Sequence, residues 1–145
     1  MNPTLIIGGV ALSTISWLNF DQKIEEIGGS TTRRFANGRA YKLTRWKKHR
    51  ITLSASGWVP PALWGVNYDQ AFMIELPMPL LLNPAENLPD DFEPREVPFD
   101  ERPVVDQSGA SGRYVFIKAM VIGERPSESS DGDGNKSWEM TCETV

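Results

Sequence analysis

The chain has 145 residues, of which 40% are hydrophobic and 23% are charged, which excludes a disordered chain and suits a single globular domain. Its net charge of −4 is unevenly distributed, because residues 1–75 carry nine basic and five acidic residues whereas residues 76–145 carry six and fourteen. The longest apolar run, Leu5 to Leu12, is far below the roughly 20 residues of a membrane-spanning helix, so we expect no membrane insertion.

The N-terminal elements are expected to be short strands. Leu5 to Leu12 predicts a first strand that kinks or turns at Gly8-Gly9, and Trp17 to Phe20 predicts a second short strand. Asp21 to Ile27 fits either a helical turn or a strand, because its isoleucines are three residues apart. Gly28-Gly29 is expected to end whichever element forms there.

Three further strands form the centre of the prediction. Thr32 to Ala36 and Arg39 to Trp46 flank Asn37-Gly38, a pair favoured in two-residue type I′ turns because both turn residues need a positive φ. Arg50 to Ser56 alternates apolar and polar residues, which indicates a half-buried third strand. The three strands would form an antiparallel meander, closed by a rigid corner where prolines cannot continue the ladder. The corner residues are Gly57, Trp58, Pro60, Pro61 and Trp64.

The middle of the chain is rich in proline. After a strand at Phe72 to Leu76, seven prolines fall between Leu76 and Pro103 and forbid both a helix and a central strand. We therefore interpret residues 77–112 as a Pro-rich acidic arm or long loop, inserted before the last hairpin. Deletion of residues 84–99 is expected to leave the domain folded and to prevent assembly. The apolar residues of this arm that need a partner surface are Leu80, Leu81, Leu82, Phe92, Val97 and Phe99.

The last two strands are the strongest in the sequence. Arg113 to Gly123 is apolar on both faces, which predicts a strand that is central or covered on both sides. Ser137 to Thr144 is its expected partner, and the connection Glu124 to Lys136 is polar, glycine-rich and expected to be mobile. We expect a mainly β single domain over residues 1–145, with six or seven strands and little helix, closed as a sandwich or barrel.

No residue pattern predicts catalysis or metal binding. His49, the only histidine, lies in a basic segment without a Ser-His-Asp or metal-ligand pattern, so a solvated surface histidine is expected. Asp131-Gly-Asp-Gly-Asn opens like a calcium loop but lacks the later EF-hand Gly and Glu, which favours a plain loop. Cys142, the only cysteine, occupies an apolar strand position typical of a buried inert thiol, and it fits a reducing cytoplasm. We predict no catalytic residue, metal ligand or cofactor, and hence no enzyme.

The basic segment allows two interpretations. Cationic strands with exposed aromatic residues, here Phe35, Tyr41 and Trp46, are typical of single-stranded nucleic-acid binders. Alternatively, the aromatic residues belong to the core and the basic face pairs with acidic protein or lines a channel for DNA. The pI near 5.0 and the acidic second half favour this alternative. The cations, with no acid between them, are Arg33, Arg34, Arg39, Lys42, Arg45, Lys47, Lys48 and Arg50.

Three segments carry a family resemblance: GGVALSTISWLNFDQ, GGSTTRRFANGRAYKLTRWKKHRITLSASGWVPPAL and NYDQAFMIELP. Their order resembles the small tail proteins of tailed bacteriophages, over residues 8 to 80. In those proteins an Arg precedes an Asn-Gly or Asp-Gly turn, and a Trp-Lys pair, a Gly-Trp-x-Pro corner and an Asp before a strand follow. The matching residues are Arg33 and Arg34, Asn37-Gly38, Trp46-Lys47, Gly57-Trp58-Val59-Pro60 and Asp69.

The resemblance implies a structural protein of the virion tail, a ring-forming distal-tail or baseplate subunit that links the tail tube to the adsorption apparatus. Such proteins have a β-sandwich, form rings that are typically sixfold around a DNA channel, and clasp neighbours with long loops or arms. The implied partners are further copies of the chain in a homo-oligomeric ring, other tail proteins, and DNA passing non-specifically through the channel. Assembly would take place in the cytoplasm of the host bacterium. Tail-tube, tail-terminator and head–tail connector subunits belong to the same class and remain alternative assignments.

Overall fold

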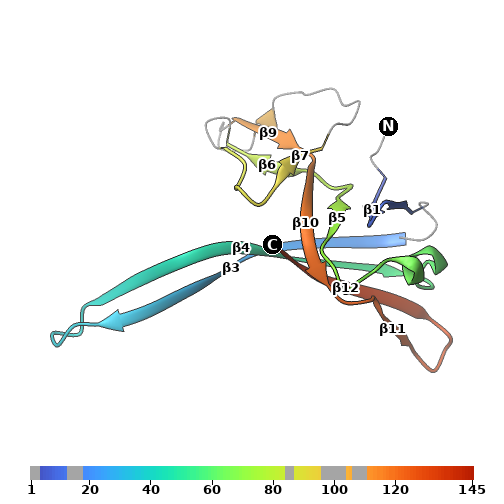
Figure 1. The fold of residues 1–145 in the computed structure, drawn as a ribbon, viewed down its shortest axis with the longest axis horizontal. Helices are drawn as coiled ribbons and strands as arrows, with labels where there is room; N and C mark the ends of the chain where they lie inside the picture. The colour runs from blue at the N-terminus through green and yellow to red at the C-terminus, as the bar shows by residue number, and fades with distance from the viewer. Residues whose placement is uncertain (1–3, 13–17, 84–86, 96–103, 106–110) are drawn as a thin grey trace.

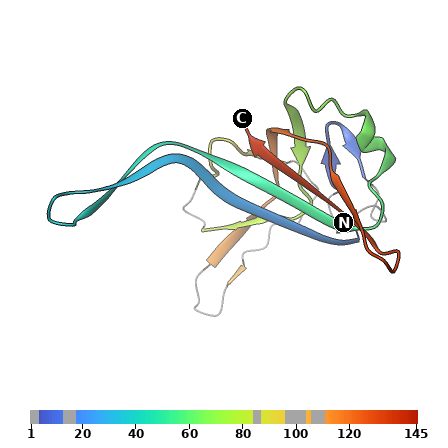
Figure 2. The same cartoon turned by 90° about the horizontal axis from the view of Figure 1, so that it is seen from below.

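The computed structural model describes residues 4–12, 18–83, 87–95, 104–105 and 111–145. This described part of the chain forms twelve β-strands and one 3-10 helix, η2 (Pro61–Gly65). Figure 1 shows a body of crossing strands from which one long hairpin projects to the side. Figure 2 shows the same projection after a turn of 90°. The prediction of a mainly β single domain with little helix is confirmed.

Nine of the described strands form one large antiparallel sheet. Two short strands lie off its main path: β11 (Ser127–Ser130) pairs with β12, and β7 (Glu93–Pro94) pairs with β10. A second sheet contains β6 (Leu80–Leu82), β9 (Ser111–Val115) and β8 (Val104–Val105), in that order. The main path of the large sheet runs through β2 (Val10–Ala11), β1 (Ile6–Ile7), β5 (Phe72–Glu75), β10 (Ile117–Gly123), β12 (Lys136–Thr144), β4 (Ala40–Ser56) and β3 (Leu18–Arg34).

The core lies on one face of this sheet, because alternation along each strand sends every second side chain to the same side. The alternation predicted for the second half of β4 and for β12 is confirmed by burial. Leu5 and Ile7 near the first strand and Leu63 of η2 join the same cluster, so these segments fold onto the apolar face. The central strands contribute Ile51, Leu53, Ala55, Phe72, Ile74, Ile117, Ala119, Val121, Trp138, Met140 and Cys142.

Closure into a barrel is not shown by the described strands. β2 and β3 stand at the two ends of the pairing order and do not pair with each other. At the β2 end, the predicted Gly-Gly turn is confirmed, because Gly8 and Gly9 have φ values of 59° and 85° and join β1 to β2. At the β3 end, the sheet continues into the projecting hairpin.

The predicted three-stranded meander is wrong. β3 and β4 each have 17 residues and form one continuous hairpin, so Arg39 to Trp46 and Arg50 to Ser56 belong to the same strand. Gly28-Gly29 does not end β3, since neither glycine has a positive φ and the strand passes through them with a bulge before Ser30. From the sequence, a polar segment and two glycines predict the end of a strand. Here continuous pairing with the neighbouring strand keeps the backbone of these residues extended.

The turn of this hairpin also differs from the predicted type I′ form. Asn19 is the only described non-glycine residue with a positive φ, so Asn37 does not adopt the conformation that type I′ needs. Gly38 has a φ of 86°, and its N–H donates to the carbonyl of Phe35 at 2.9 Å. The Phe35 N–H in turn donates to the carbonyl of Arg39 at 2.8 Å. This pattern is that of a three-residue loop with glycine in the left-handed position.

The predicted strand over residues 113–123 is divided at Phe116 into β9 and β10, which belong to different sheets. β10 is central, as predicted, because it lies between β5 and β12. It is not covered on both sides, since Met120 and Ile122 are 42% and 50% exposed. The connection after it contains β11, a strand that its polar sequence did not predict.

The described residues of the Pro-rich segment lie against their own chain. β6 pairs with β9, β7 pairs with β10, and the side chain of Phe92 is buried in the core. The guanidinium of Arg95 is also buried and donates to the carbonyl of Leu76 at 3.0 Å. Deletion of residues 84–99 would therefore remove Phe92 from the core and the buried Arg95, which argues against the expectation that the domain stays folded without them.

Candidate functional site

The projecting part of the β3–β4 hairpin is the leading candidate for a functional surface. β12 pairs with β4 only between Arg50 and Ser56, so towards the turn β4 has β3 as its only strand partner in the described structure. We define residues 28–47 as the hairpin arm. At about 3.3 Å per residue, the arm extends roughly 30 Å beyond the sheet. An isolated two-stranded hairpin is marginally stable in water, which makes a binding partner for the arm physically favourable.

Large apolar side chains of the arm face solvent. Phe35, Leu43 and Trp46 are 56%, 44% and 51% exposed. Phe35 stacks on Tyr41 with ring centroids 4.9 Å apart, which covers part of both rings at the arm tip. The interpretation that these aromatic residues belong to the core is wrong, because the arm has no sheet or helix packed over it among the described residues. Exposed aromatic groups on a projecting element are typical of a contact surface.

The cations of the arm are distributed over both of its faces. The cross-strand pair Arg33 and Tyr41 shares one face, whereas Arg34 and Lys42 lie on the other. No ion pair within the described part of the chain engages Arg33, Arg34, Arg39 or Lys42. The predicted basic face is therefore a basic arm, positive on both sides. The side chain of Arg45 lies outside the described part of the structure.

At the base of the hairpin, three basic residues make contacts with their own domain: Lys47, the last residue of the arm, and Lys48 and Arg50 below it. Lys47 lies 3.5 Å from Glu26 across the strand pair. Lys48 donates to the carbonyl of Val145 at 2.9 Å, and Arg50 lies 3.1 Å from Glu143 and 3.6 Å from Glu25. Hydrogen bonding to Glu143 raises the pKa of Arg50 above its ordinary value. These three cations therefore already contact groups of their own domain, unlike Arg33, Arg34, Arg39 and Lys42 of the arm.

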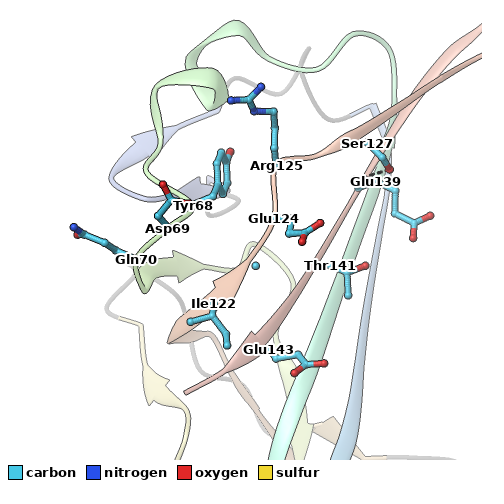
Figure 3. Close-up of a pocket in the computed structure, with 11 residues that line it drawn as sticks. Tyr68, Asp69, Gln70, Ile122, Glu124, Arg125, Ser127, Glu139, Thr141 and Glu143 are labelled. Atoms are coloured by element: carbon cyan, nitrogen blue, oxygen red, sulfur yellow. Dashed lines mark hydrogen bonds between the residues drawn. The ribbon is translucent and has the colours of Figure 1, made fainter.

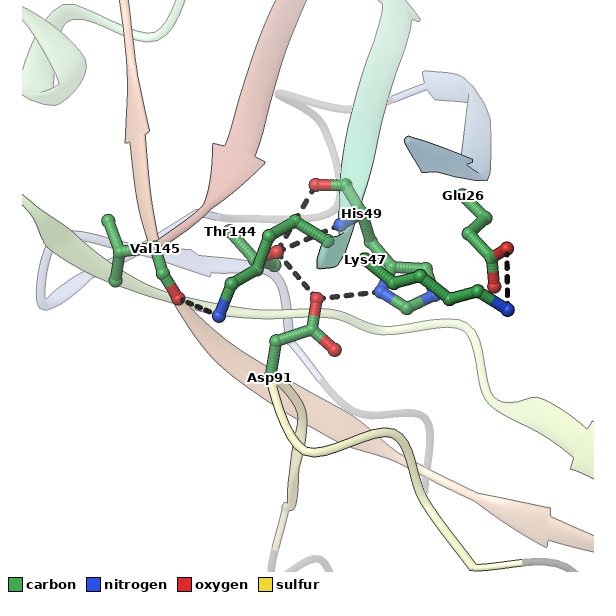
Figure 4. Close-up of polar contacts among 7 residues, drawn as sticks. Glu26, Lys47, His49, Asp91, Thr144 and Val145 are labelled. Atoms are coloured by element: carbon green, nitrogen blue, oxygen red, sulfur yellow. Dashed lines mark hydrogen bonds and ion pairs between the residues drawn. The ribbon is translucent and has the colours of Figure 1, made fainter. Parts of the chain in front are cut away.

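A buried polar cluster also holds the base of the hairpin (Figure 4). Nδ1 of His49 and Oγ1 of Thr144 each lie 2.6 Å from Oδ2 of Asp91, and the backbone N–H of His49 donates to Oγ1 of Thr144 at 2.9 Å. The His49 ring packs against Phe92 with centroids 4.6 Å apart. The expectation of a solvated His49 is wrong, because its side chain is only 13% exposed.

The cluster resembles a catalytic triad in composition but not in geometry. A triad needs a hydroxyl that gives its proton to the imidazole, whereas here Thr144 and His49 both donate to the same oxygen of Asp91. Burial raises the pKa of Asp91, but the hydrogen bonds from Thr144 and His49 outweigh this effect and hold the pKa below its ordinary value of 3.8. The ionised carboxylate therefore joins β4, β12 and the turn before β7 as a structural latch.

The predicted rigid corner is held by two cation–π contacts with the last hairpin. Lys136 lies 4.1 Å from the ring centroid of Trp58, and Arg125 lies 4.5 Å from that of Trp64. Gly57, with a φ of 106°, donates to the carbonyl of Lys136 at 2.8 Å. Pro60 is buried and Pro61 begins η2. Both tryptophans keep about half or more of their surface exposed, at 68% for Trp58 and 49% for Trp64.

Beside this corner, an open groove of about 730 Å³ lies on the solvent-facing side of the sheet (Figure 3). β12 contributes Glu139, Thr141 and Glu143, and the segment Tyr68 to Gln70 forms the opposite wall. Ile122, Glu124 and Arg125 lie between them. Four of the lining residues are acidic and one is basic, so the groove is negatively charged. It contains no histidine or cysteine that could act as a general base or nucleophile.

Other candidate chemistry is accounted for by structural contacts. Both carboxylate oxygens of Asp131 accept hydrogen bonds from its own loop, from Asp133 and Asn135, and these bonds lower its pKa. Burial raises the pKa of the Cys142 thiol to about 12, as expected for an inert group. Within the described ranges, no three His, Cys, Asp or Glu side chains are grouped as metal ligands. No helix in those ranges is long and apolar enough to cross a membrane.

The apolar residues predicted for an interface have different environments. Leu81 is 53% exposed, whereas Leu80 packs partly against the core and Leu82 is half-buried. Phe92 is buried within its own chain, which leaves it little surface for a neighbour. Val97 and Phe99 lie outside the described residues.

The comparisons with known proteins do not assign the chain to a family. No protein-family model matches the chain, and neither a curated protein nor a solved structure matches it. The arm, the latch and the groove are therefore interpreted from their own geometry.

Proposed function

We propose that this protein is a structural subunit of a bacteriophage tail, which assembles into a homo-oligomeric ring, with six copies as the expected number. In this proposal it acts at the distal tail or baseplate and links the tail tube to the adsorption apparatus, with tail-tube, terminator and connector positions as alternatives within the class. It has no catalytic role and needs no cofactor. The finer fold, a sandwich or barrel as in other ring-forming tail proteins, is part of the same proposal.

One observation supports the proposal most strongly: a hairpin of two 17-residue strands, whose outer part projects from the sheet without a further described strand beside it. Folding such an arm costs backbone entropy that its own few contacts do not offset. Contact with a neighbour would bury Phe35, Leu43 and Trp46 and satisfy the edges of the two strands. The resemblance over residues 8 to 80, which includes this hairpin, connects such an assembly to phage tails.

The test is negative-stain electron microscopy of the purified chain over a concentration series, with the mass measured on the same samples. We expect rings with an open centre, and their mass gives the number of subunits. A matched variant joins Ser30 to Thr44 through an Asn-Gly turn and so removes residues 31–43, none of which belongs to the core. Rings of the wild type that vanish in this variant, with unchanged circular dichroism, would support the proposal. Monomers at every concentration would contradict it.

A second candidate is a single-stranded nucleic-acid-binding module. It is favoured by the exposed Phe35 and Trp46 on a projecting strand pair that also carries Arg33, Arg39 and Lys42, which form no ion pair with a described residue. Stacking and phosphate contacts together bind single strands. The discriminating measurement is the titration of a labelled oligonucleotide at low salt. Binding that is lost when Arg39, Lys42 and Arg45 are changed to Glu favours this candidate, and no binding at low salt excludes it.

A further inference from the structure

The hairpin arm and the groove beside the corner are complementary in charge. The arm, residues 28–47, contains six basic residues and no acidic one, and of those whose side chains are described only Lys47 forms an ion pair with a described residue. The groove is lined by four acids, of which Glu143 already pairs with Arg50, while Glu124 and Glu139 form no ion pair with any described residue. Both surfaces therefore keep free charges of opposite sign.

The two surfaces are also complementary in polarity and shape. The arm presents Phe35 and Leu43, which are half exposed, and the groove offers the exposed side chain of Ile122, with exposed Met120 two residues before it on β10. An open groove of about 730 Å³ accommodates several side chains of a strand pair without admitting a whole domain. An extended element laid against an open sheet face is a common mode of recognition.

The arm does not reach the groove of its own chain. Figures 1 and 2 both place the tip of the hairpin at one end of the long axis, and β11 and β12, which border the groove, towards the other end. The contact can therefore form only between two copies. It is heterologous, since different surfaces meet, and repeated contacts of this kind generate a closed ring or an open helical array.

We propose that the hairpin arm of one copy binds the groove formed by Tyr68–Gln70, β10 and β12 of a second copy. Arg39 and Lys42 of the arm face Glu124 and Glu139 of the groove, and the exposed apolar groups of the arm cover Ile122. This inference rests on the proposed function, for which it supplies the contact between neighbouring subunits. Electrostatic attraction makes the association sensitive to ionic strength.

Paired charge reversals test the contact directly. Variant one carries R39E and K42E in the arm, and variant two carries E124K and E139K in the groove; all four side chains are exposed. Each variant alone should weaken self-association by roughly tenfold or more, because like charges then face each other. A third variant with all four changes should restore it, as should a mixture of variants one and two. Exposed charges outside both surfaces supply the controls: K23E for the arm, and E128K with D133K for the groove.

Sedimentation velocity over a concentration and salt series gives the readout, with circular dichroism to verify folding. The contact would be supported if variants one and two lose self-association, variant three recovers it and the control variants associate like the wild type. Wild-type association that variant two leaves unchanged would overturn this inference while the proposed assembly function stands. A wild type that is monomeric up to millimolar concentration would overturn both. Oligonucleotide binding that only variant one loses, without self-association, would instead assign the arm to nucleic acid.

Discussion

Nδ1 of His49 lies 2.6 Å from Oδ2 of Asp91, although 42 residues separate the two along the chain. The contact joins the base of the projecting hairpin to the turn that precedes β7, and Thr144 adds the last strand through the same oxygen. The base of the arm is therefore fixed by three segments, while among the described strands its tip pairs only within the hairpin. A rigid base and a free tip are what a docking arm requires.

Removal of the latch carboxylate is predicted to destabilise the fold. Asp91→Ala leaves the imidazole of His49 and the hydroxyl of Thr144 without their shared acceptor in a buried site. We expect the free energy of unfolding to fall by about 1–3 kcal/mol, the usual cost of unsatisfied buried polar groups. Urea unfolding followed by tryptophan fluorescence measures this change. Asp90→Ala, a change at the exposed neighbouring residue, is the control and should have little effect; equal losses in the two variants would contradict the latch.

The latch also predicts how stability depends on pH. The pKa of Asp91 is lower in the folded chain than its ordinary value of 3.8, so the unfolded chain binds this proton more readily. The contribution of Asp91 is therefore complete above about pH 4 and is lost as the pH falls through the folded pKa. Urea unfolding of the wild type and of Asp91→Asn, from pH 6 down to pH 2.5, should show two curves that converge at the acidic end. Curves that stay parallel would show that Asp91 does not titrate in this way.

The bulge at the base of the arm depends on glycine. A Cβ at position 28 would lie 2.5 Å from the carbonyl oxygen of Trp46, a backbone atom that cannot move without breaking the strand pair. Gly28→Ala should therefore weaken the pairing of the arm, and amide hydrogen exchange in residues 30–45 should accelerate by roughly tenfold or more. Gly132→Ala, where nothing lies within 4 Å, is the matched control. Unchanged exchange in Gly28→Ala would indicate that the arm does not hold this geometry.

The single cysteine is predicted to be unreactive in the folded protein. Burial raises the pKa of the Cys142 thiol to about 12, so that at pH 8 only about one thiol in ten thousand is ionised. A disulfide reagent such as DTNB should react with less than a tenth of the thiol in the native protein over minutes, and with one thiol per chain in denaturant. Rapid labelling under native conditions would mean that β12 opens readily at its C-terminal end.

Local patterns predicted the parts of the fold that are decided by burial. Alternation placed Ile51, Leu53 and Ala55 on the core side of β4, since a half-buried strand requires it. The continuity of the hairpin could not be predicted, because Gly28-Gly29 and the run Lys47 to His49 are held extended by pairing with a neighbouring strand. Patterns within a single segment do not contain that information.

The candidate site was predicted only in part. The cations and aromatic residues of the arm were recognised from their sequence, but their exposure depends on where the third strand of the sheet ends. The latch was missed because Asp91 lies among other acids in a Pro-rich segment, 42 and 53 residues from its partners His49 and Thr144. The groove was missed for the same reason, since β10, β12 and the segment Tyr68 to Gln70 meet only through sheet topology.

The mass of the wild-type chain, measured beside that of the variant that lacks residues 31–43, tests the central claim most directly. Both proteins should be studied at the same concentrations by multi-angle light scattering, from micromolar to several hundred micromolar. The account predicts that the wild type forms a defined oligomer whose mass is a whole multiple of 16.2 kDa, and that the shortened variant stays monomeric and folded. A wild type and a variant with the same number of subunits at every concentration would contradict the claim that the arm joins neighbouring subunits.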